Sequence, residues 1–556
     1  MTNNPTWPAA AASRIRIKIT NDDSYCRLFF NHSTGSINLI PLTADDASAI
    51  TTAPHAEIYD HSQTSANVEQ DPLYQSYLSQ SKDGSKQMII DSFHPDDVIG
   101  ANLSLEYNLH NPNTFHGMQS YASAQINIYC YPKTNRKKQR EPNHKTYIVD
   151  SKCCEDFSDV RALVQSIRTL SGLQHNNTNN NKNALPQRFL VILNPYSGGN
   201  GPKSKSGATF VYETMVKPML EQAGVEHDKL ATNHGGHAKE RMELRKSTSD
   251  DNDNNGDSND CTDSELKDIS EYDAIIAMGG DGILFEIFQG IHARSTDEAQ
   301  ILCKLKFGIV PCGTCNGLAK SILHWSDNAA YTPMESVFQI CKGHTSRLDL
   351  ASYQLAKTEK TYTSFLSFSW GLIADCDLES ECLRWLGAIR TDIWAVYRGI
   401  LFPKKYRARF SYLPLSNKTN NGSASTKIDL PKLNEPLPKD WVTIEDDFSV
   451  FWVCNTTHAS YNVFTCPMSK MNDGVFHVLI VRSSVSRLRL LQMLLKLETG
   501  GHIECEGLEI ISCLAYRLEP LSDNTYNDLD GELIEGGTIQ ARLFNTAQFF
   551  AGKVDR

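Results

Sequence analysis

The stretch from residue 272 to residue 290 constrains the fold of this chain more than any other. Residues 274–278 form a short, continuous apolar run with two adjacent isoleucines, which predicts a parallel strand buried on both faces. Beyond Gly282 the apolar residues follow helical spacing, so we expect a helix to begin there. Between strand and helix lies the sequence Gly279-Gly280-Asp281-Gly282.

The composition of this turn suits a phosphate-handling site. Glycines let the backbone approach a bulky anion, and the free N–H groups at a helix start attract phosphate. Asp281 would repel a phosphate, but it is suited to accept the proton of an attacking hydroxyl. The position at a helix start should keep Asp281 ionised at neutral pH. The alternative is an ordinary tight turn in which Asp281 is the helix N-cap.

Two other segments repeat the pattern of strand, small-residue loop and helix. An apolar strand at 189–193 precedes the glycine-rich loop 194–201, and a strand at 306–310 precedes the loop 311–317. Three such units predict an α/β fold with a parallel sheet, whose loops gather at the carboxyl ends of the strands, where such folds bind ligands. The loops lack the Gly-Lys-Ser/Thr of a P-loop, and no Gly-x-Gly-x-x-Gly precedes a suitably spaced acid. A nucleoside triphosphate is therefore favoured over a dinucleotide.

These motifs resemble a known family. Asn194-Pro195 with its glycines, residues 279–282 and residues 313–317 are similar to the catalytic signature of diacylglycerol, ceramide and sphingosine kinases. The acidic block 369–381, the arginines that follow it and Asp530-Gly531-Glu532 resemble sphingosine (long-chain base) kinase in particular. The similarity extends from about residue 189 to about residue 550.

The resemblance implies roles for individual residues. Asp281 would be the general base that deprotonates the primary hydroxyl of a sphingoid base. ATP, used with Mg2+, would be bound by Asn194, Pro195, Tyr196, Thr232, Gly282, Glu286, Gly313, Thr314, Cys315, Arg384, Arg390, Asp530, Gly531 and Glu532. The lipid would be bound by Gly279, Gly280, Ser367, Asp377, Leu494 and His502. Four positions depart from the family pattern and leave the detail of ATP contact open, namely Cys315, Tyr196, His234 and Gly235. Metal ligands stay unassigned.

The acidic block can also be interpreted without the resemblance. Asp375 and Asp377 are two residues apart, so on a strand both would face one way. Two carboxylates on one face repel each other unless a cation lies near them, and an amine-bearing substrate would supply one. Arg384 and Arg390 would suit phosphate oxygens. The alternative is a helix start capped by its own acids, with the arginines in surface ion pairs.

Composition limits the class of protein. The chain has 556 residues, a net charge of −11 and an isoelectric point near 5.9, which argues against a nucleic-acid partner. Its 15 cysteines have no repeating spacing, which favours a reduced cytosolic compartment. No run of eighteen apolar residues occurs, so we expect a cytoplasmic protein that visits membranes peripherally. A homodimer is also compatible with the sequence.

Composition also suggests three regions. Residues 1–178, which end at an asparagine-rich linker (176–183), contain alternating strands near 14–19 and 124–130 and an amphipathic segment near 160–170, which resembles a pleckstrin-homology module. Residues 186–346 would be the catalytic α/β domain, with an acidic, disordered insertion at 247–263. Residues 347–556 would be a β-rich, mainly antiparallel lipid-binding domain with a second insertion at 416–439. We expect strands there at 363–368, 448–454, 475–481 and 508–516.

Three smaller features allow two interpretations each. The apolar helix at 487–498 is either core or, as the resemblance implies, a wall of an acyl-chain pocket. The basic run 136–140 is either a solvated loop or a site for anionic lipid. Cys312 and Cys315 are either inert or a redox-active pair whose thiol pKa is lowered at a helix N-terminus.

The sequence thus predicts an ATP-dependent kinase of sphingosine and related long-chain bases. The alternatives are a ceramide or diacylglycerol kinase, whose substrates lack a free amine for Asp377, and a non-catalytic lipid-binding adaptor with a kinase-like fold. The presence together of Asp281, Glu286, Arg384 and Glu532 argues against the adaptor.

Overall fold

The computed structural model describes most of the chain, in two compact units. The described residues are 16–18, 25–31, 36–41, 91–107, 121–134, 139–150, 158–168, 187–198, 207–244, 266–313, 316–380, 382–383, 389–401, 404–415 and 428–554. One unit comprises residues 1–184 with 221–224, and the other comprises 185–220 with 225–556. The predicted linker (176–183) and acidic insertion (247–263) lie outside the described residues.

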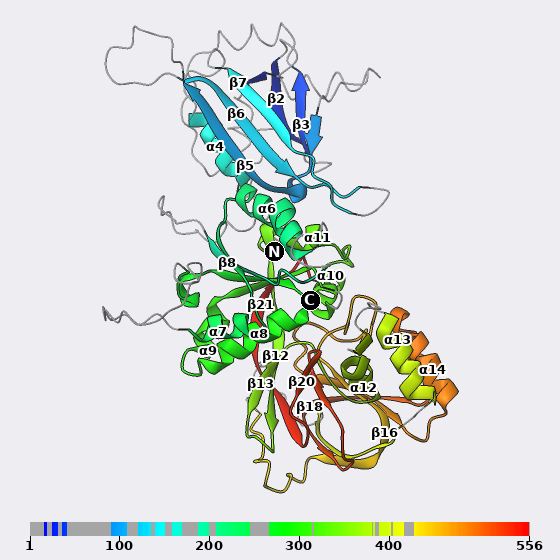
Figure 1. The fold of residues 1–556 in the computed structure, drawn as a ribbon. Coiled ribbons are helices and arrows are strands. Elements are labelled where there is room, and N and C mark those ends of the chain that lie inside the picture. The colour runs from blue at the N-terminus through cyan, green and yellow to red at the C-terminus, as the bar shows by residue number, and fades with distance from the viewer. Residues whose placement is uncertain are drawn as a thin grey trace, which may run out of the picture. The chain divides into compact units, whose positions relative to one another are not determined.

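The N-terminal unit is an antiparallel sheet followed by a helix (Figure 1). The order of its strands is β4-β3-β2-β1-β7-β6-β5. Its elements are β1 (Arg16–Lys18), β2 (Tyr25–Asn31), β3 (Ser36–Pro41), β4 (Asp91–Phe93), the 3₁₀ turn η2 (Pro95–Asp97), β5 (Val98–Tyr107), β6 (Tyr121–Cys130), β7 (Lys145–Asp150) and α4 (Ser158–Arg168). Helix α4 buries Val160, Leu163, Val164 and Ile167, which lie on one helical face, and it contacts β5 and β6. The predicted strands near 14–19 and 124–130 and the predicted helix are therefore present.

One residue of the basic run 136–140 is used inside this unit. The Nη1 atom of Arg140 donates hydrogen bonds to Asp97 Oδ1 at 3.0 Å and to the Tyr131 carbonyl at 2.7 Å. These two bonds join the turn η2 to the residue after β6, so Arg140 has a structural role inside this unit. Residues 136–138 lie outside the described part of the chain.

The second unit begins with an α/β half. Strands β9, β8, β10 and β11 pair in parallel, in that order. The strands are β8 (Arg188–Leu193), β9 (Glu226–Ala231), β10 (Ala274–Gly279) and β11 (Lys306–Pro311). The helical elements are α5 (Ala208–Val211), the π-helical η5 (Tyr212–Val216), α6 (Lys217–Gln222), α7 (His237–Glu243), η6 (Ile269–Glu271), α8 (Asp281–Ala293), α9 (Glu298–Lys304), α10 (Gly317–Trp325) and α11 (Pro333–Lys342).

Burial of this half follows the sequence pattern. All six residues of β10 are buried, as expected for a strand covered on both faces. Helices α7, α8 and α9 lie on one side of the strands and α11 on the other (Figure 1). The predicted apolar stripe of α8 is buried in the core: Ile283, Leu284, Ile287, Phe288 and Ile291. At Gly290 a Cβ atom would come within 2.4 Å of the Lys239 carbonyl oxygen, so glycine allows α7 and α8 to pack closely.

The rest of the second unit is mainly antiparallel. Its strands are β12 (Thr345–Leu355), β13 (Thr361–Ser364), β14 (Ser367–Gly371), β15 (Tyr406–Pro414), β16 (Val442–Cys454), β17 (Phe476–Arg482), β18 (Leu508–Pro520), β19 (Asn527–Leu529), β20 (Glu532–Ile534) and β21 (Ile539–Phe550). Its helical elements are α12 (Leu372–Glu379), α13 (Ile389–Val396), the π-helical η8 (Tyr397–Leu401), α14 (Arg487–Leu495), η10 (Leu497–Thr499) and η11 (Gly501–Glu504). Strand β21 pairs with β11 in parallel and with β12 and β18 antiparallel, so it joins the two halves into one mixed sheet.

One expectation for this half needs correction. The strand predicted at 363–368 is two strands, β13 and β14, because the backbone N–H groups of Phe365 and Leu366 donate to the carboxylate of Asp530 instead of a neighbouring strand. Of the insertion predicted at 416–439, residues from 428 onward pack against the sheet, since the Arg517 guanidinium donates to carbonyl oxygens of Pro431, Lys432 and Glu435. The other predicted strands are present as β16, β17 and β18.

Candidate active site

Three loops meet at the carboxyl ends of β8, β10 and β11. The Gly279 carbonyl accepts hydrogen bonds from the backbone N–H groups of Cys312 and Gly313, both at 3.1 Å. A Cβ atom at Gly313 would lie 2.9 Å from Gly280 Cα, so a side chain there would push the loops apart. The Asn194 N–H donates to the Met278 carbonyl at 3.1 Å, which joins the first loop to β10. The predicted convergence of the glycine loops is therefore present.

Asp281 is the first residue of α8 and is almost completely buried. Its Oδ2 accepts from the Gly317 N–H at 2.6 Å and its Oδ1 from the Leu318 N–H at 3.3 Å, so the carboxylate lies at the start of α10. Burial raises the pKa of Asp281 to about 7, although the two N–H bonds act in the opposite direction. The expectation that a helix start keeps this group fully ionised at neutral pH is wrong. A pKa near 7 is instead the value that suits a general base at neutral pH.

The Asp530-Gly531 turn brings β19 and β20 to the same place. Both residues have positive φ, 56° and 86°, as a two-residue hairpin turn requires. The Asp530 carboxylate accepts from Ser364 Oγ at 2.7 Å and from the N–H groups of Phe365, Leu366 and Ser367 at 2.9–3.1 Å. Burial nevertheless raises the pKa of Asp530 to about 6. This predicted nucleotide contact, and the buried Ser367, therefore hold the turn in position.

Glu532 follows this turn and lies against the loop that carries Asp281. A Cβ atom at Gly282 would come within 2.5 Å of Glu532 Oε1, so glycine at 282 makes room for the glutamate. The carboxyl-terminal hairpin, about 250 residues further along the chain, thus reaches the Gly-Gly-Asp-Gly loop. The resemblance grouped these residues, and the structure places them together.

Glu286 and Thr232 connect the fourth parallel strand to this site. The Glu286 carboxylate accepts from the Gly236 N–H at 2.9 Å and from the Ala238 N–H at 3.1 Å, which caps the start of α7. Thr232 is buried directly after β9. His234 pairs with Glu240, its Nε2 lying 3.0 Å from Glu240 Oε2. His234, which departs from the family pattern, therefore has a partner six residues along the chain in Glu240.

The remaining predicted nucleotide residues are only partly described. Asn194 Oδ1 accepts from the Tyr196 N–H at 2.9 Å and shapes a turn that includes Pro195 and leaves the Tyr196 side chain exposed. Thr314, Cys315 and Arg384 lie outside the described residues, as does the side chain of Arg390, which belongs to α13.

The redox interpretation of Cys312 is not supported by its surroundings. The thiol is buried, and burial raises its pKa to about 12, whereas reactive cysteines have a lowered pKa. The expected lowering at a helix start is therefore wrong for Cys312, because desolvation of the thiolate dominates. Cys315 lies outside the described residues.

Asp375 and Asp377 lie on helix α12, which corrects the expectation of a strand. Two residues along a helix turn through about 200°, so the two carboxylates face different ways. Asp375 is buried and accepts from Lys404 Nζ at 2.8 Å and from the Tyr406 hydroxyl at 2.7 Å. Asp377 is half-buried on another side, where its Oδ2 lies 3.8 Å from the position of a Cβ at Gly531. Asp377 is thus the member of the pair beside the hairpin turn.

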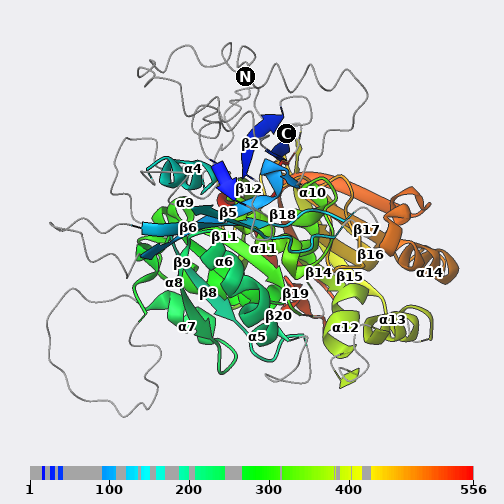
Figure 2. The same cartoon turned by 90° about the horizontal axis from the view of Figure 1, so that it is seen from above.

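Glu379, on the last turn of α12, binds side chains of α13 and η8. It accepts from Arg398 Nε at 2.6 Å, from Arg398 Nη2 at 2.8 Å and from Trp394 Nε1 at 2.9 Å. Burial would raise the pKa of this carboxyl, but the bonds from Arg398 and Trp394 outweigh it and lower the pKa. Helices α12 and α13 lie side by side as a result (Figure 2). Sequence reasoning missed this role, because nothing in the spacing pairs residue 379 with residue 398.

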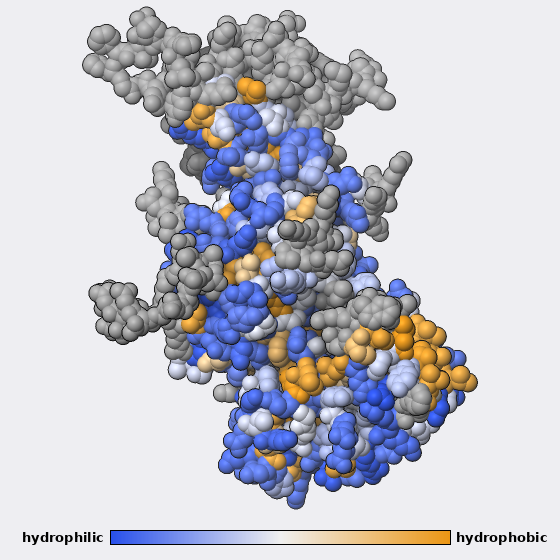
Figure 3. Space-filling model, in the orientation of Figure 1, coloured by the Kyte–Doolittle hydropathy of each residue, from blue (hydrophilic) through white to orange (hydrophobic). Residues whose placement is uncertain are grey.

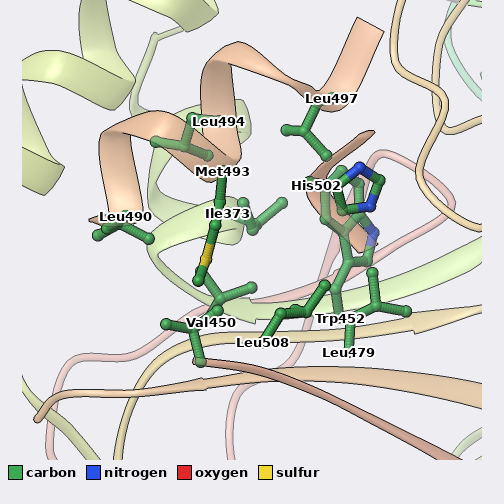
Figure 4. A pocket seen from close by; sticks show the side chains of 11 residues that line it. Ile373, Val450, Trp452, Leu479, Leu490, Met493, Leu494, Leu497, His502 and Leu508 are labelled. Atoms are coloured by element: carbon green, nitrogen blue, oxygen red, sulfur yellow. The ribbon is translucent and has the colours of Figure 1, made fainter. Parts of the chain in front are cut away.

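An apolar pocket lies next to α12 (Figure 4). It encloses about 330 Å³ including its open mouth. Ten of its lining residues are apolar and the other is histidine: Ile373, Val450, Trp452, Leu479, Val481, Leu490, Met493, Leu494, Leu497, His502 and Leu508. The buried His502 has its Nε2 2.8 Å from the Thr465 carbonyl oxygen. Leu494 and His502, both predicted as lipid contacts, therefore line one pocket, and α14 forms its wall.

Helix α12 links the pocket to the acidic turn. Ile373, which lines the pocket, and Asp377 are four residues apart and so lie on one face of α12. An elongated ligand on this face would have its apolar part in the pocket and a cationic end at Asp377. Asp377 lies beside Gly531, and the next residue, Glu532, lies against Gly282, which follows Asp281 in the chain.

Comparison with known proteins finds similarity to lipid kinases. The model of the diacylglycerol kinase catalytic domain matches residues 188–353. Sphingosine kinase 1 of Mus musculus is 31% identical over 375 residues, which cover 64% of this chain and 89% of the mouse protein. Sphingosine kinase 2 of Arabidopsis thaliana is 30% identical over 370 residues, covering 64% of this chain and 70% of the plant protein. A solved structure of a putative diacylglycerol kinase from Bacillus anthracis str. Sterne has a TM-score of 0.43 at 17% identity, covers 66% of this chain and 99% of its own, and is too distant to add to these.

Proposed function

Because this chain belongs to the sphingosine kinase family, and is therefore an ATP-dependent kinase of sphingoid long-chain bases, we propose which residues bind the base, accept its proton and bind ATP. The base lies along α12, with its hydrocarbon chain in the apolar pocket and its ammonium group at Asp377. The observation that carries this proposal is the shared helical face of Ile373 and Asp377. It matches a substrate that is apolar at one end and cationic at the other.

Asp281 is the general base in this proposal. It accepts the proton of the primary hydroxyl as that oxygen attacks the terminal phosphorus of ATP, while the bond from this phosphorus to the bridging oxygen breaks and ADP leaves. The support is its burial at the meeting point of the glycine loops and a pKa raised by that burial to about 7. A Cβ atom at Gly313 would lie 2.9 Å from Gly280 Cα, so glycine there lets the two loops pack closely, and we propose that their backbone N–H groups face the phosphates.

The residues around the nucleotide can be proposed as a group, without separate contacts for each. A kinase of this family uses ATP, and we propose that Asn194, Thr232, Glu286, Arg384, Arg390 and Glu532 surround the nucleotide. Among the described residues no group of three His, Cys, Asp or Glu side chains could hold a metal ion. Mg2+ is commonly bound by one or two carboxylates together with substrate phosphates, so we propose that it arrives on the nucleotide.

The test of the function is a comparison of acceptors. Purified protein with radiolabelled ATP should phosphorylate sphingosine in preference to ceramide and diacylglycerol, because those two lipids offer no ammonium group to Asp377. Equal or faster labelling of diacylglycerol would contradict the proposal. Absence of labelling with every lipid, at normal ATP binding, would favour the non-catalytic adaptor.

An exposed apolar patch supports a transient membrane surface as partner. The patch consists of Ile393, Val396, Tyr397 and Leu401 on α13 and η8 and of Leu488 and Leu495 on α14. Figure 3 shows apolar side chains gathered over α13 and α14. Leu488 and Leu495 are each 74% exposed, and α14 also forms the pocket wall. We propose that the patch enters a lipid surface beside the pocket. No helix among the described residues is long and apolar enough to cross a membrane.

Replacing Leu488 and Leu495 together by glutamine should weaken binding to lipid vesicles by at least about tenfold, since burying one leucine contributes about 1.5–3 kcal/mol. Vesicle sedimentation would measure the binding, and activity in detergent micelles should stay near the parent value. The matched control is Leu244→Gln, because Leu244 is 58% exposed and lies outside the patch. Equal vesicle binding by the double variant and the parent would refute the membrane role of the patch.

Leu494→Trp should raise the KM for sphingosine about 5- to 150-fold, because overfilling a packed apolar site costs about 1–3 kcal/mol. The KM for a short-chain analogue should rise less, since that chain needs less of the pocket. The control is Leu244→Trp, at an exposed position outside both the pocket lining and the patch. If the two tryptophan variants raised the KM for sphingosine equally, the pocket would not be the binding site of the acyl chain.

The domain division stays a proposal. We propose residues 1–178 as a pleckstrin-homology-like module, 186–346 as the catalytic domain and 347–556 as the lipid-binding domain. The support for the first is a seven-stranded antiparallel sheet followed by one helix. An experimental structure in which α4 does not pack on β5 would contradict it.

A further inference from the structure

Asp528 is a buried acid that the reaction described above does not use. It belongs to β19 and stands opposite Ser369 of β14 in the antiparallel register. The Ser369 hydroxyl donates to Asp528 Oδ2 at 2.6 Å. The other carboxylate oxygen, Oδ1, is also buried and has no hydrogen-bond partner among the described residues. A buried oxygen without a hydrogen bond is costly, so a donor on a bound ligand would stabilise it.

Among the described residues, the charges that act most strongly on Asp528 are all negative. Burial and then the nearby Asp377 raise its pKa well above the usual range, with smaller contributions from Asp530 and Glu532, while the Ser369 bond acts in the opposite direction. Asp530 already has four donors. Glu532 lies at Gly282, on the side of the catalytic loop. Asp377 and Asp528 are therefore the pair between which a cation would be most strongly attracted.

We propose that Asp528 joins Asp377 to form a two-carboxylate site for the substrate's ammonium group, and that Asp528 makes the enzyme selective for acceptors with a free amine. The inference rests on the proposed placement of the sphingoid base along α12.

The chemistry of the amine explains the selectivity. A primary ammonium carries a positive charge and three N–H donors, so it can serve both carboxylates at once. Its charge favours the ionised form of Asp528, which then releases its proton to solvent. An N-acylated amine has one N–H and no charge. It would leave two acids close together with at least one buried oxygen unpaired.

Two substitutions separate the charge of Asp528 from its structural bond. Asp528→Asn removes the charge but keeps an oxygen that accepts from Ser369. Ser369→Ala removes the bond but keeps the charge. Asp528→Asn should raise the KM for sphingosine about tenfold or more, with the KM for ATP unchanged, because a desolvated charge partner is lost. Ser369→Ala should raise the KM for sphingosine less than Asp528→Asn does, because the carboxylate charge remains, and should leave the KM for ATP unchanged.

A neutral acceptor tests the selectivity directly. The ratio of kcat/KM for sphingosine to kcat/KM for N-acetylated sphingosine should fall about tenfold in Asp528→Asn and clearly less in Ser369→Ala. Equal effects of the two variants would reduce Asp528 to a structural residue. An unchanged ratio in Asp528→Asn, with a large effect of Asp377→Asn, would overturn this inference and leave the proposed function standing.

Folding of the variants is checked by thermal melting. If Asp528→Asn does not fold, Asp528→Ser provides a second neutral side chain that can accept from Ser369. Calorimetric titration of sphingosine without nucleotide gives a readout that does not depend on turnover. Parent protein that binds no sphingoid base at all would count against the proposed function as well, which is a different result from failure of Asp528 alone.

Discussion

Asp281→Asn is expected to lower kcat by about two to four orders of magnitude, the usual contribution of a positioned general base. The asparagine keeps the size of the side chain and one oxygen for the N–H groups of Gly317 or Leu318, but it cannot accept the hydroxyl proton. ATP affinity, measured by calorimetry, should change little, because the carboxylate holds a proton and not a phosphate. Turnover close to the parent value would exclude Asp281 as the base.

The pH dependence gives a second measurement on the same residue. Because the pKa of Asp281 is raised to about 7, the base is increasingly protonated below neutrality, so kcat/KM for sphingosine should fall as the pH drops through about 7. A profile that stays flat down to pH 5 would contradict a base with this pKa. The residual activity of Asp281→Asn should lack this limb.

The same pKa predicts that stability changes with pH in the opposite direction to activity: activity falls as the pH drops, whereas stability falls as the pH rises. A carboxyl whose pKa is higher in the folded than in the unfolded chain stabilises the fold below its unfolded pKa, and this stabilisation is lost as the pH rises through the folded pKa. The parent should therefore lose stability relative to Asp281→Asn between about pH 4 and pH 7. A difference in Tm that is constant over this range would mean that Asp281 is not desolvated as described.

Much of the catalytic half could be predicted from the sequence because its signals are local. The apolar run at β10 and the helical spacing of Ile283, Ile287 and Ile291 each specify one element. Glycine marks the loops because a side chain at Gly313 or Gly282 would collide with a neighbouring segment. Parallel pairing then brings loops that are far apart in sequence to one edge.

The parts that could not be predicted depend on long-range pairing and burial. The acidic block has no helical apolar pattern of its own, so nothing local distinguished helix α12 from a strand. The pKa values of Asp281 and Cys312 depend on how much chain covers them, which the spacing of residues does not report. Asp528 could not be predicted either, because it depends on long-range pairing: its partner Ser369 lies 159 residues away in the sequence.

Asp377→Asn is expected to raise the KM for sphingosine by about 30- to 5,000-fold, because losing one partner of a desolvated charge pair costs about 2–5 kcal/mol. The KM for ATP should rise far less, since Asp377 shares the pocket face of α12 with Ile373. Steady-state kinetics with each substrate varied in turn would measure both constants. An unchanged KM for sphingosine would assign Asp377 a structural role.

Asp375→Asn is the matched control, two residues away on the same helix. Asp375 is buried and serves Lys404 and the Tyr406 hydroxyl, so its loss should lower the free energy of unfolding by about 1–3 kcal/mol and leave the KM for sphingosine almost unchanged. Thermal melting separates the two variants, because Asp377→Asn should keep a parental Tm. The reverse outcome, a large KM effect at 375 and a lowered Tm at 377, would mean that the ammonium group approaches α12 from its other side. Opposite effects from two neighbouring carboxylates would follow from their different faces on α12 and could not arise from a general acidity of the block.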